Sequence, residues 1–110
     1  MKKLVIAIFI LLTACETLVP TPTPAQLEVA QKRWPSATLS ELTEGRKSYV
    51  NQCSGCHNLP APAELSADEW PSVIQEMGSE YAKIPQSEIE LITRYVVSVR
   101  ETPPPKKSSN

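Results

Sequence analysis

The spacing of apolar residues predicts three helices in the central and C-terminal parts of the chain. Apolar or small residues recur three and four positions apart within 38–53, 66–78 and 85–101, which places their side chains on one face of a helix. None of these stretches shows the apolar–polar alternation of a half-buried strand. We therefore expect an all-α domain.

Capping residues indicate where these helices begin and end. A Ser or Thr followed three residues later by Glu can form a capping box, in which each side chain accepts a hydrogen bond from the other residue's backbone N–H. Gly78 is expected to stop the second helix, and the prolines after Thr102 to stop the third. The capping pairs are Thr38 with Glu41, Ser66 with Glu69 (or Asp68 alone as the cap), and Ser87 with Glu90.

The same spacing predicts which side chains form the core. They are Leu42, Gly45, Tyr49 and Cys53 in the first helix, Trp70, Val73, Ile74 and Met77 in the second, and Ile89, Ile92, Val96 and Val99 in the third. The core of so small a domain rarely supplies more than about 3–5 kcal/mol, and natural chains of this size add a cofactor, metal or disulfide. We expect such a group here.

The N-terminal residues 1–14 have the layout of a secretory signal peptide. Lys2 and Lys3 precede an apolar run from Leu4 to Leu12, which is shorter than the ~20 residues that span a bilayer. The following "LTAC" resembles the lipobox of bacterial lipoproteins, which implies that Cys15 is acylated and becomes the first mature residue. We therefore expect the protein to be anchored in a membrane and to face the periplasm or the outer cell surface.

Proline-rich segments suggest the boundaries of the domain. Residues 15–38 are expected to form the lipid anchor and a spacer, because prolines alternate with threonines from Pro20 to Pro24 and favour an extended chain. The nine residues from Glu16 to Pro24 would span roughly 28 Å at about 3.1 Å per residue. Residues 39–101 would form the folded domain, and 102–110 a disordered tail.

The net charge excludes one class of partner. Without Lys2 and Lys3, nine basic residues face twelve acidic ones, a net charge of −3. Nucleic-acid binding, which needs a basic surface, is not expected. Seven acidic residues and one base, Lys83, lie between Glu64 and Glu90. Such a run is usually a solvated helix face, although it can also dock a basic partner.

The five residues from Cys53 to His57, "CSGCH", match the C-x-x-C-H pattern of covalent haem attachment. Each thiol can add to one vinyl group of the same porphyrin, and the adjacent imidazole can bind its iron. Both cysteines beyond Cys15 and the only histidine of the chain fall in this stretch. An export signal agrees with this chemistry, because the attachment takes place outside the cytoplasm.

Three other interpretations of this stretch remain. A redox thiol pair belongs at a helix N-terminus within a βαβ unit, whereas this pair follows a helix. A structural zinc site needs four ligands, so a carboxylate would have to join Cys53, Cys56 and His57. A structural disulfide would leave the histidine without a role.

Over residues 39–101 the chain resembles a small class I cytochrome c with a single haem. The order of features agrees: a helix that runs into C-x-x-C-H, a segment with a methionine, and a closing helix. The resemblance implies a cytochrome c-like fold with three main helices around one haem c, attached through Cys53 and Cys56, with His57 as the proximal iron ligand. It also implies that Gly45 meets Tyr95 where the first and last helices cross.

Met77 is the candidate for the distal iron ligand. It is the only thioether of the mature chain, because Met1 would leave with the signal peptide. A methionine ligand favours electron transfer and raises the reduction potential, but methionine is also a common core filler. The second ring nitrogen of His57 is expected to donate to the carbonyl of Pro60 or Pro62.

These features predict a one-electron carrier, tethered to the membrane, whose partners are periplasmic or membrane redox proteins. We expect no enzymatic activity, because the only histidine is committed to iron and no acid–base or nucleophilic group of residues is evident. Two alternatives stay open. One is a haem-based sensor that binds a gas at an open sixth site, and the other is a cytochrome subunit of a larger redox enzyme.

Overall fold

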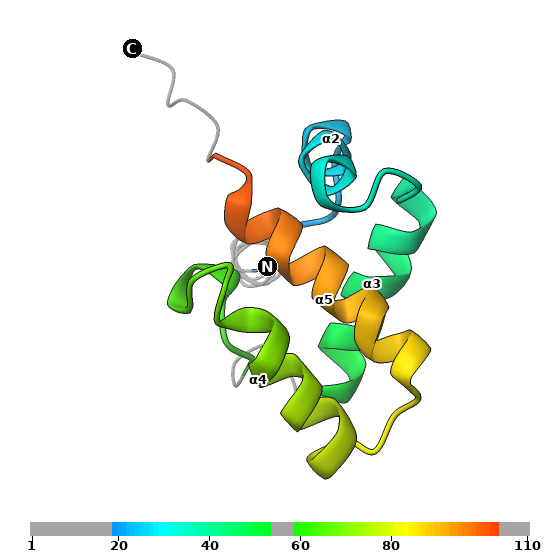
Figure 1. Ribbon diagram of the computed structural model, residues 1–110, viewed down its shortest axis with the longest axis vertical. Coiled ribbons are helices and arrows are strands. Elements are labelled where there is room, and N and C mark those ends of the chain that lie inside the picture. The colour runs from blue at the N-terminus through cyan, green and yellow to red at the C-terminus, as the bar shows by residue number, and fades with distance from the viewer. Residues whose placement is uncertain (1–18, 54–58, 104–110) are drawn as a thin grey trace, which may run out of the picture.

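A computed structural model describes residues 19–53 and 59–103 of the chain, and this part is all-helical (Figure 1). The all-α prediction is confirmed, but four α-helices are present in the described part where we expected three. They are α2 (Pro24–Arg33), α3 (Leu39–Gln52), α4 (Trp70–Glu76) and α5 (Gln86–Glu101), with a short 3-10 helix η1 (Pro62–Glu64) and a π-helix η2 (Met77–Tyr81).

Helices α3 and α5 cross at the centre of the molecule and make the most extensive contact in the fold (Figure 1). A Cβ added at Gly45 would lie 2.8 Å from the carbonyl carbon of Leu91, 3.0 Å from Cβ of Tyr95, and closer still to the Leu91 oxygen. Only glycine allows this approach of the two backbones. The predicted meeting of Gly45 with Tyr95 is confirmed.

The start of α3 was predicted correctly and the start of α5 was not. Thr38 and Glu41 form the expected capping box, with N···O distances of 3.0 and 3.1 Å. Helix α5 begins at Gln86, because the carbonyl of Pro85 already accepts hydrogen bonds from the N–H groups of residues 88 and 89. Ser87 therefore lies inside the helix and does not cap it.

The second predicted helix, α4, begins at Trp70 with Glu69 as its N-cap, later than the predicted caps Ser66 or Asp68, and its helical path extends past Gly78. Ser66 and Glu69 form a capping box before α4, with N···O distances of 3.1 and 3.2 Å. The helical path continues through η2, and the chain turns at Lys83, whose φ is 55°. Gly78 instead allows a close contact, because an added Cβ would lie 2.6 Å from Cγ1 of Ile89. The expected stop at Gly78 was wrong.

The described part of the predicted spacer, 19–38, is folded onto the helices. Thr23 and Gln26 form a capping box for α2, with N···O distances of 3.1 and 3.3 Å. At its other end, Arg33 forms an ion pair with Glu101 at the end of α5, at 2.6 Å. The packed region therefore includes residues well before 39.

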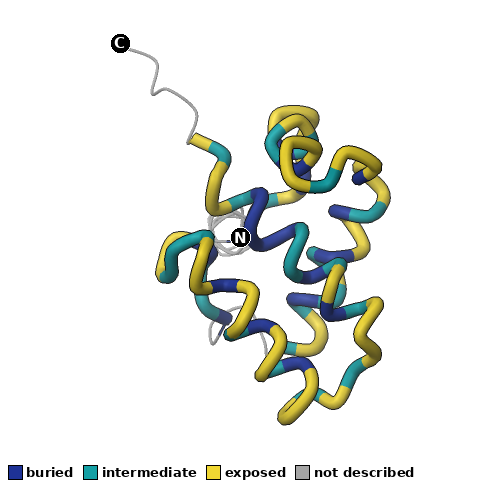
Figure 2. Tube along the Cα trace, in the orientation of Figure 1, coloured by how far each residue is buried: buried dark blue, intermediate teal, exposed yellow. Residues whose placement is uncertain are grey.

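The core occupies the space between α3, α4 and α5 (Figure 2). Val19 joins this core, although it precedes every helix that the structure describes. A smaller cluster under α2 contains Ala30, Ala37 and Leu42. Trp34 packs against both clusters, and the guanidinium of Arg94 lies 5.7 Å from the centre of its ring.

The buried stripe of α5 agrees with its prediction. Ile89, Ile92 and Val96 are buried, and Val99 is partly buried against the same core. The helix ends at Glu101, as the following prolines predicted. Within residues 19–53 and 59–103, no helix has the length and apolar character that crossing a bilayer requires.

Candidate cofactor site

Cys53 lies at the C-terminal end of α3, where it caps the helix. Its backbone N–H donates to the carbonyl of Tyr49 at 3.1 Å, and its side chain is half-buried against the core. Helix α3 thus delivers the first cysteine of the C-x-x-C-H stretch, as expected. The other predicted ligands Cys56 and His57, the lipidation residue Cys15, the signal peptide 1–14 and residues 104–110 lie outside the described residues.

An apolar cavity of about 50 Å³ lies beside Cys53. Cys53 and Met77, which are 24 positions apart in the sequence, line this same cavity. The four residues of the predicted apolar stripe on the second helix all contribute to its wall. The lining residues are Tyr49, Cys53, Pro60, Leu65, Trp70, Val73, Ile74 and Met77.

Met77 stands where the helical path changes from α to π. Its N–H bonds to carbonyls of α4, and its carbonyl accepts from the N–H of Ala82 at 2.9 Å, a bond that spans five residues. Such π-helical turns are rare and often lie at functional sites. The sequence predicted that Met77 faces inward, but the change of helix type at this residue has no sequence signal that we can identify.

The aromatic side chains of the wall hold the loop that follows the C-x-x-C-H stretch. The Tyr49 hydroxyl donates to the carbonyl of Pro60 at 2.6 Å, and Nε1 of Trp70 donates to the carbonyl of Pro62 at 2.7 Å. The two rings meet edge to face, with centroids 6.3 Å apart. Burial raises the pKa of Tyr49, which keeps this hydroxyl protonated to a higher pH than an exposed tyrosine.

These two carbonyls are the ones we expected to accept from His57. Each already accepts one hydrogen bond from an aromatic side chain. A carbonyl oxygen has a second lone pair, so Pro60 and Pro62 can each accept one more. Because His57 lies outside the described residues, its hydrogen bond stays a prediction.

The surroundings of Cys53 differ from those of a reactive thiol. Burial raises the pKa of Cys53, and its position at a helix C-terminus also disfavours the thiolate. A redox-active cysteine needs the opposite shift. The described wall of the cavity contains no carboxylate that could complete a zinc site. The donors and walls that are described suit a haem better than a redox thiol pair or a zinc site.

The cavity itself is much smaller than a porphyrin. Its volume of about 50 Å³ is close to that of one or two water molecules in the liquid. The chemistry of the residues fits a haem, since a thiol and a thioether share apolar, aromatic walls. The size does not fit without movement, so the walls would have to separate to admit the group.

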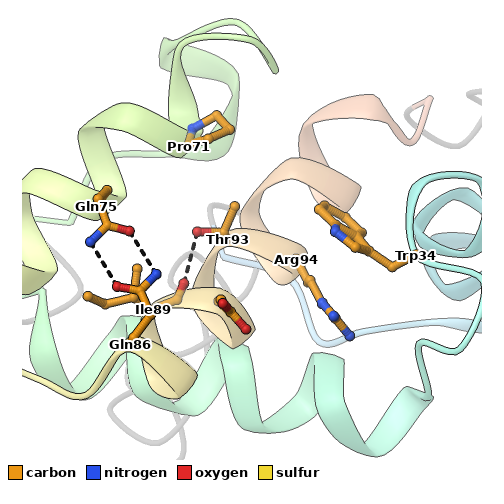
Figure 3. A pocket seen from close by; sticks show the side chains of 8 residues that line it. Trp34, Pro71, Gln75, Gln86, Ile89, Thr93 and Arg94 are labelled. Carbon is orange, nitrogen blue, oxygen red and sulfur yellow. Dashed lines mark hydrogen bonds between the residues drawn. The ribbon is translucent and has the colours of Figure 1, made fainter.

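A larger hollow of about 350 Å³ opens between α4, α5 and the end of α2 (Figure 3). Gln75 of α4 and Gln86 of α5 hold each other across it by two amide hydrogen bonds of 2.9 Å. None of the described residues that line it is a cysteine, histidine or methionine. It is therefore not the candidate cofactor site.

Comparisons with protein-family models, curated proteins and solved structures find no match to this chain.

Proposed function

We propose that this protein is a c-type cytochrome with one covalently bound haem, which carries single electrons and is held at the membrane by a lipid on Cys15. The observation that carries the proposal is the shared apolar cavity of Cys53 and Met77. The first residue of a C-x-x-C-H stretch and the only thioether of the mature chain meet there. The cytochrome c-like arrangement of helices around the haem is part of this proposal.

Four residues would hold the group. Cys53 and Cys56 would form thioethers with the porphyrin, and His57 and Met77 would bind the iron. A bound haem supplies reversible one-electron transfer, and a histidine–methionine pair raises its potential. The apolar residues of the cavity wall would exclude water from it.

The aromatic residues of the wall have a positioning role in this proposal. Tyr49 and Trp70 fix the carbonyls of Pro60 and Pro62, and so fix the loop that follows His57. The partners would be periplasmic or membrane redox proteins. The exposed acidic side chains between Glu64 and Glu90 would favour a partner with a basic docking surface.

The spectrum of the mature protein tests the proposal. The protein is produced in a host that attaches haem to C-x-x-C-H sequences, and its absorbance is recorded oxidised, reduced, and reduced with carbon monoxide. We expect a red protein whose haem stays attached after denaturation, with a low-spin spectrum, a reversible one-electron wave and slow carbon monoxide binding. A colourless, folded protein with free thiols at Cys53 and Cys56 would refute the proposal.

Two variants test the distal ligand. Met77→Ala should give a high-spin spectrum, rapid carbon monoxide binding and a lower potential, because the thioether is lost. Val73→Ala is the matched control, since Val73 lines the same cavity and has no donor atom. If the unchanged protein is already high-spin and binds carbon monoxide rapidly, the proposed electron carrier is refuted in favour of a haem-based gas sensor.

A further inference from the structure

The segment before α2 is bound to both central helices. Val19 is only 1% exposed, and its carbonyl accepts from Nε of Arg46 on α3 at 3.0 Å. The carbonyl of Pro20 accepts from the hydroxyl of Tyr95 on α5 at 2.6 Å. Pro22 is buried as well. We call residues 19–22 the N-terminal strap.

The strap leaves a very short tether to the proposed anchor. Four residue steps separate Cys15 from Val19. At about 3.3–3.6 Å per residue, a fully extended chain of this length reaches at most ~14 Å. This reach is half of the roughly 28 Å that a spacer from Glu16 to Pro24 would span. It is also less than the shortest dimension of the molecule, 24 Å.

We propose that the surface that carries the N-terminal strap lies against the lipid headgroups of the membrane. The inference rests on the proposed lipid at Cys15. With a tether of at most ~14 Å, the strap stays close to the bilayer in every orientation that the domain adopts. Helix α2, into which the strap leads, and the turn after η2 lie at opposite ends of the long axis (Figure 1).

The strap also lies close to the candidate cofactor site. Tyr95, which binds the strap through its hydroxyl, packs against Tyr49 with ring centroids 6.4 Å apart. Tyr49 in turn lines the cavity beside Cys53. Two aromatic rings therefore separate the membrane-facing strap from that cavity. The positive charge of Arg46 at the strap is compatible with anionic headgroups.

Fluorescence quenching by the bilayer tests this orientation. A fluorophore is attached to Thr21→Cys in the strap or to Tyr81→Cys at the end of η2, both at exposed positions. The lipidated holoprotein is inserted into phosphatidylcholine vesicles with a nitroxide on a fraction of the headgroups. We expect quenching at position 21 to be at least threefold stronger than at position 81. The unsubstituted protein measures any labelling of the natural cysteines.

A longer tether provides the matched control. Twenty Gly and Ser residues are inserted between positions 18 and 19, which gives a flexible chain with a reach of about 27 Å. The difference between the two labels should then become small. Equal quenching without the insertion, or stronger quenching at Tyr81→Cys, would overturn the inference.

Haem content and the mass of the anchor separate the possible failures. A red, lipidated protein with equal quenching would refute only the orientation. A colourless protein with unequal quenching would refute the proposed haem and leave the orientation standing. A mass that shows no acyl group on Cys15 would overturn the orientation, because the short tether would then have no anchor.

Discussion

A methyl group added at Gly45 should force apart the two helices that define the fold. The new Cβ would lie 2.8 Å from the carbonyl carbon of Leu91 and 3.0 Å from Cβ of Tyr95. Because the nearest obstacle is backbone, shortening the Leu91 side chain would not relieve the overlap. Overpacking costs about 1–3 kcal/mol, and we take the upper end for a backbone obstacle. Alanine recovers about 1 kcal/mol of helix propensity, so we expect Gly45→Ala to lower the free energy of unfolding by about 2 kcal/mol.

Urea unfolding of the mature protein, followed by far-ultraviolet circular dichroism, measures this loss. A change of about 2 kcal/mol corresponds to a melting temperature lower by about 8–16 °C for a domain of this size. Glu44→Ala is the matched control, because this neighbouring side chain is exposed and its loss should cost less than about 0.5 kcal/mol. If Gly45→Ala is as stable as the unchanged protein, the close packing of α3 on α5 is not as described.

Two further substitutions test single interactions. Trp70→Phe should cost about 1–3 kcal/mol in urea unfolding, because the buried bond of 2.7 Å to the carbonyl of Pro62 is lost; a smaller loss would mean that water replaces the donor. Glu101→Gln removes the negative charge that pairs with Arg33, whose hydrogen bond holds the pKa of Glu101 below its ordinary value. The unfolded chain binds that proton more readily, so the pair stabilises the fold at neutral pH and loses its effect as pH falls through the folded pKa. We expect a loss below about 1 kcal/mol at pH 7 for this exposed pair, and none well below pH 4, by urea unfolding at each pH; a difference that persists in acid would contradict it.

Local patterns predicted much of the candidate site. The spacing of Trp70, Val73, Ile74 and Met77 placed all four on one face, and all four line the cavity beside Cys53. The capping box at Thr38 correctly predicted the start of α3, and Cys53 lies at the end of this helix as expected. These predictions succeed because both signals depend only on residues within one helix.

The errors have separate physical reasons. Helix α2 was missed because the alternating prolines suggested an extended chain, although Thr23, Pro24 and Gln26 form a helix start that the sequence contains. We predicted Gly78 as a helix stop. A glycine is needed there instead because the side chain of Ile89, eleven residues further on, packs against it. The hydrogen bonds from aromatic side chains to proline carbonyls are also tertiary contacts, and no spacing rule reveals them.

Those bonds to proline carbonyls affect how the sequence can vary. Tyr49, Trp70 and Tyr95 each supply a ring to the core and a donor to a carbonyl, at residues 60, 62 and 20 respectively. The acceptors are backbone atoms, so the bonds themselves set no requirement on the side chains at positions 20, 60 and 62. Substitution should therefore be tolerated unequally across each pair. The aromatic residue is restricted by its ring and its donor, whereas the proline is restricted only by its own packing, which involves Pro60 in the cavity wall and the buried Pro62.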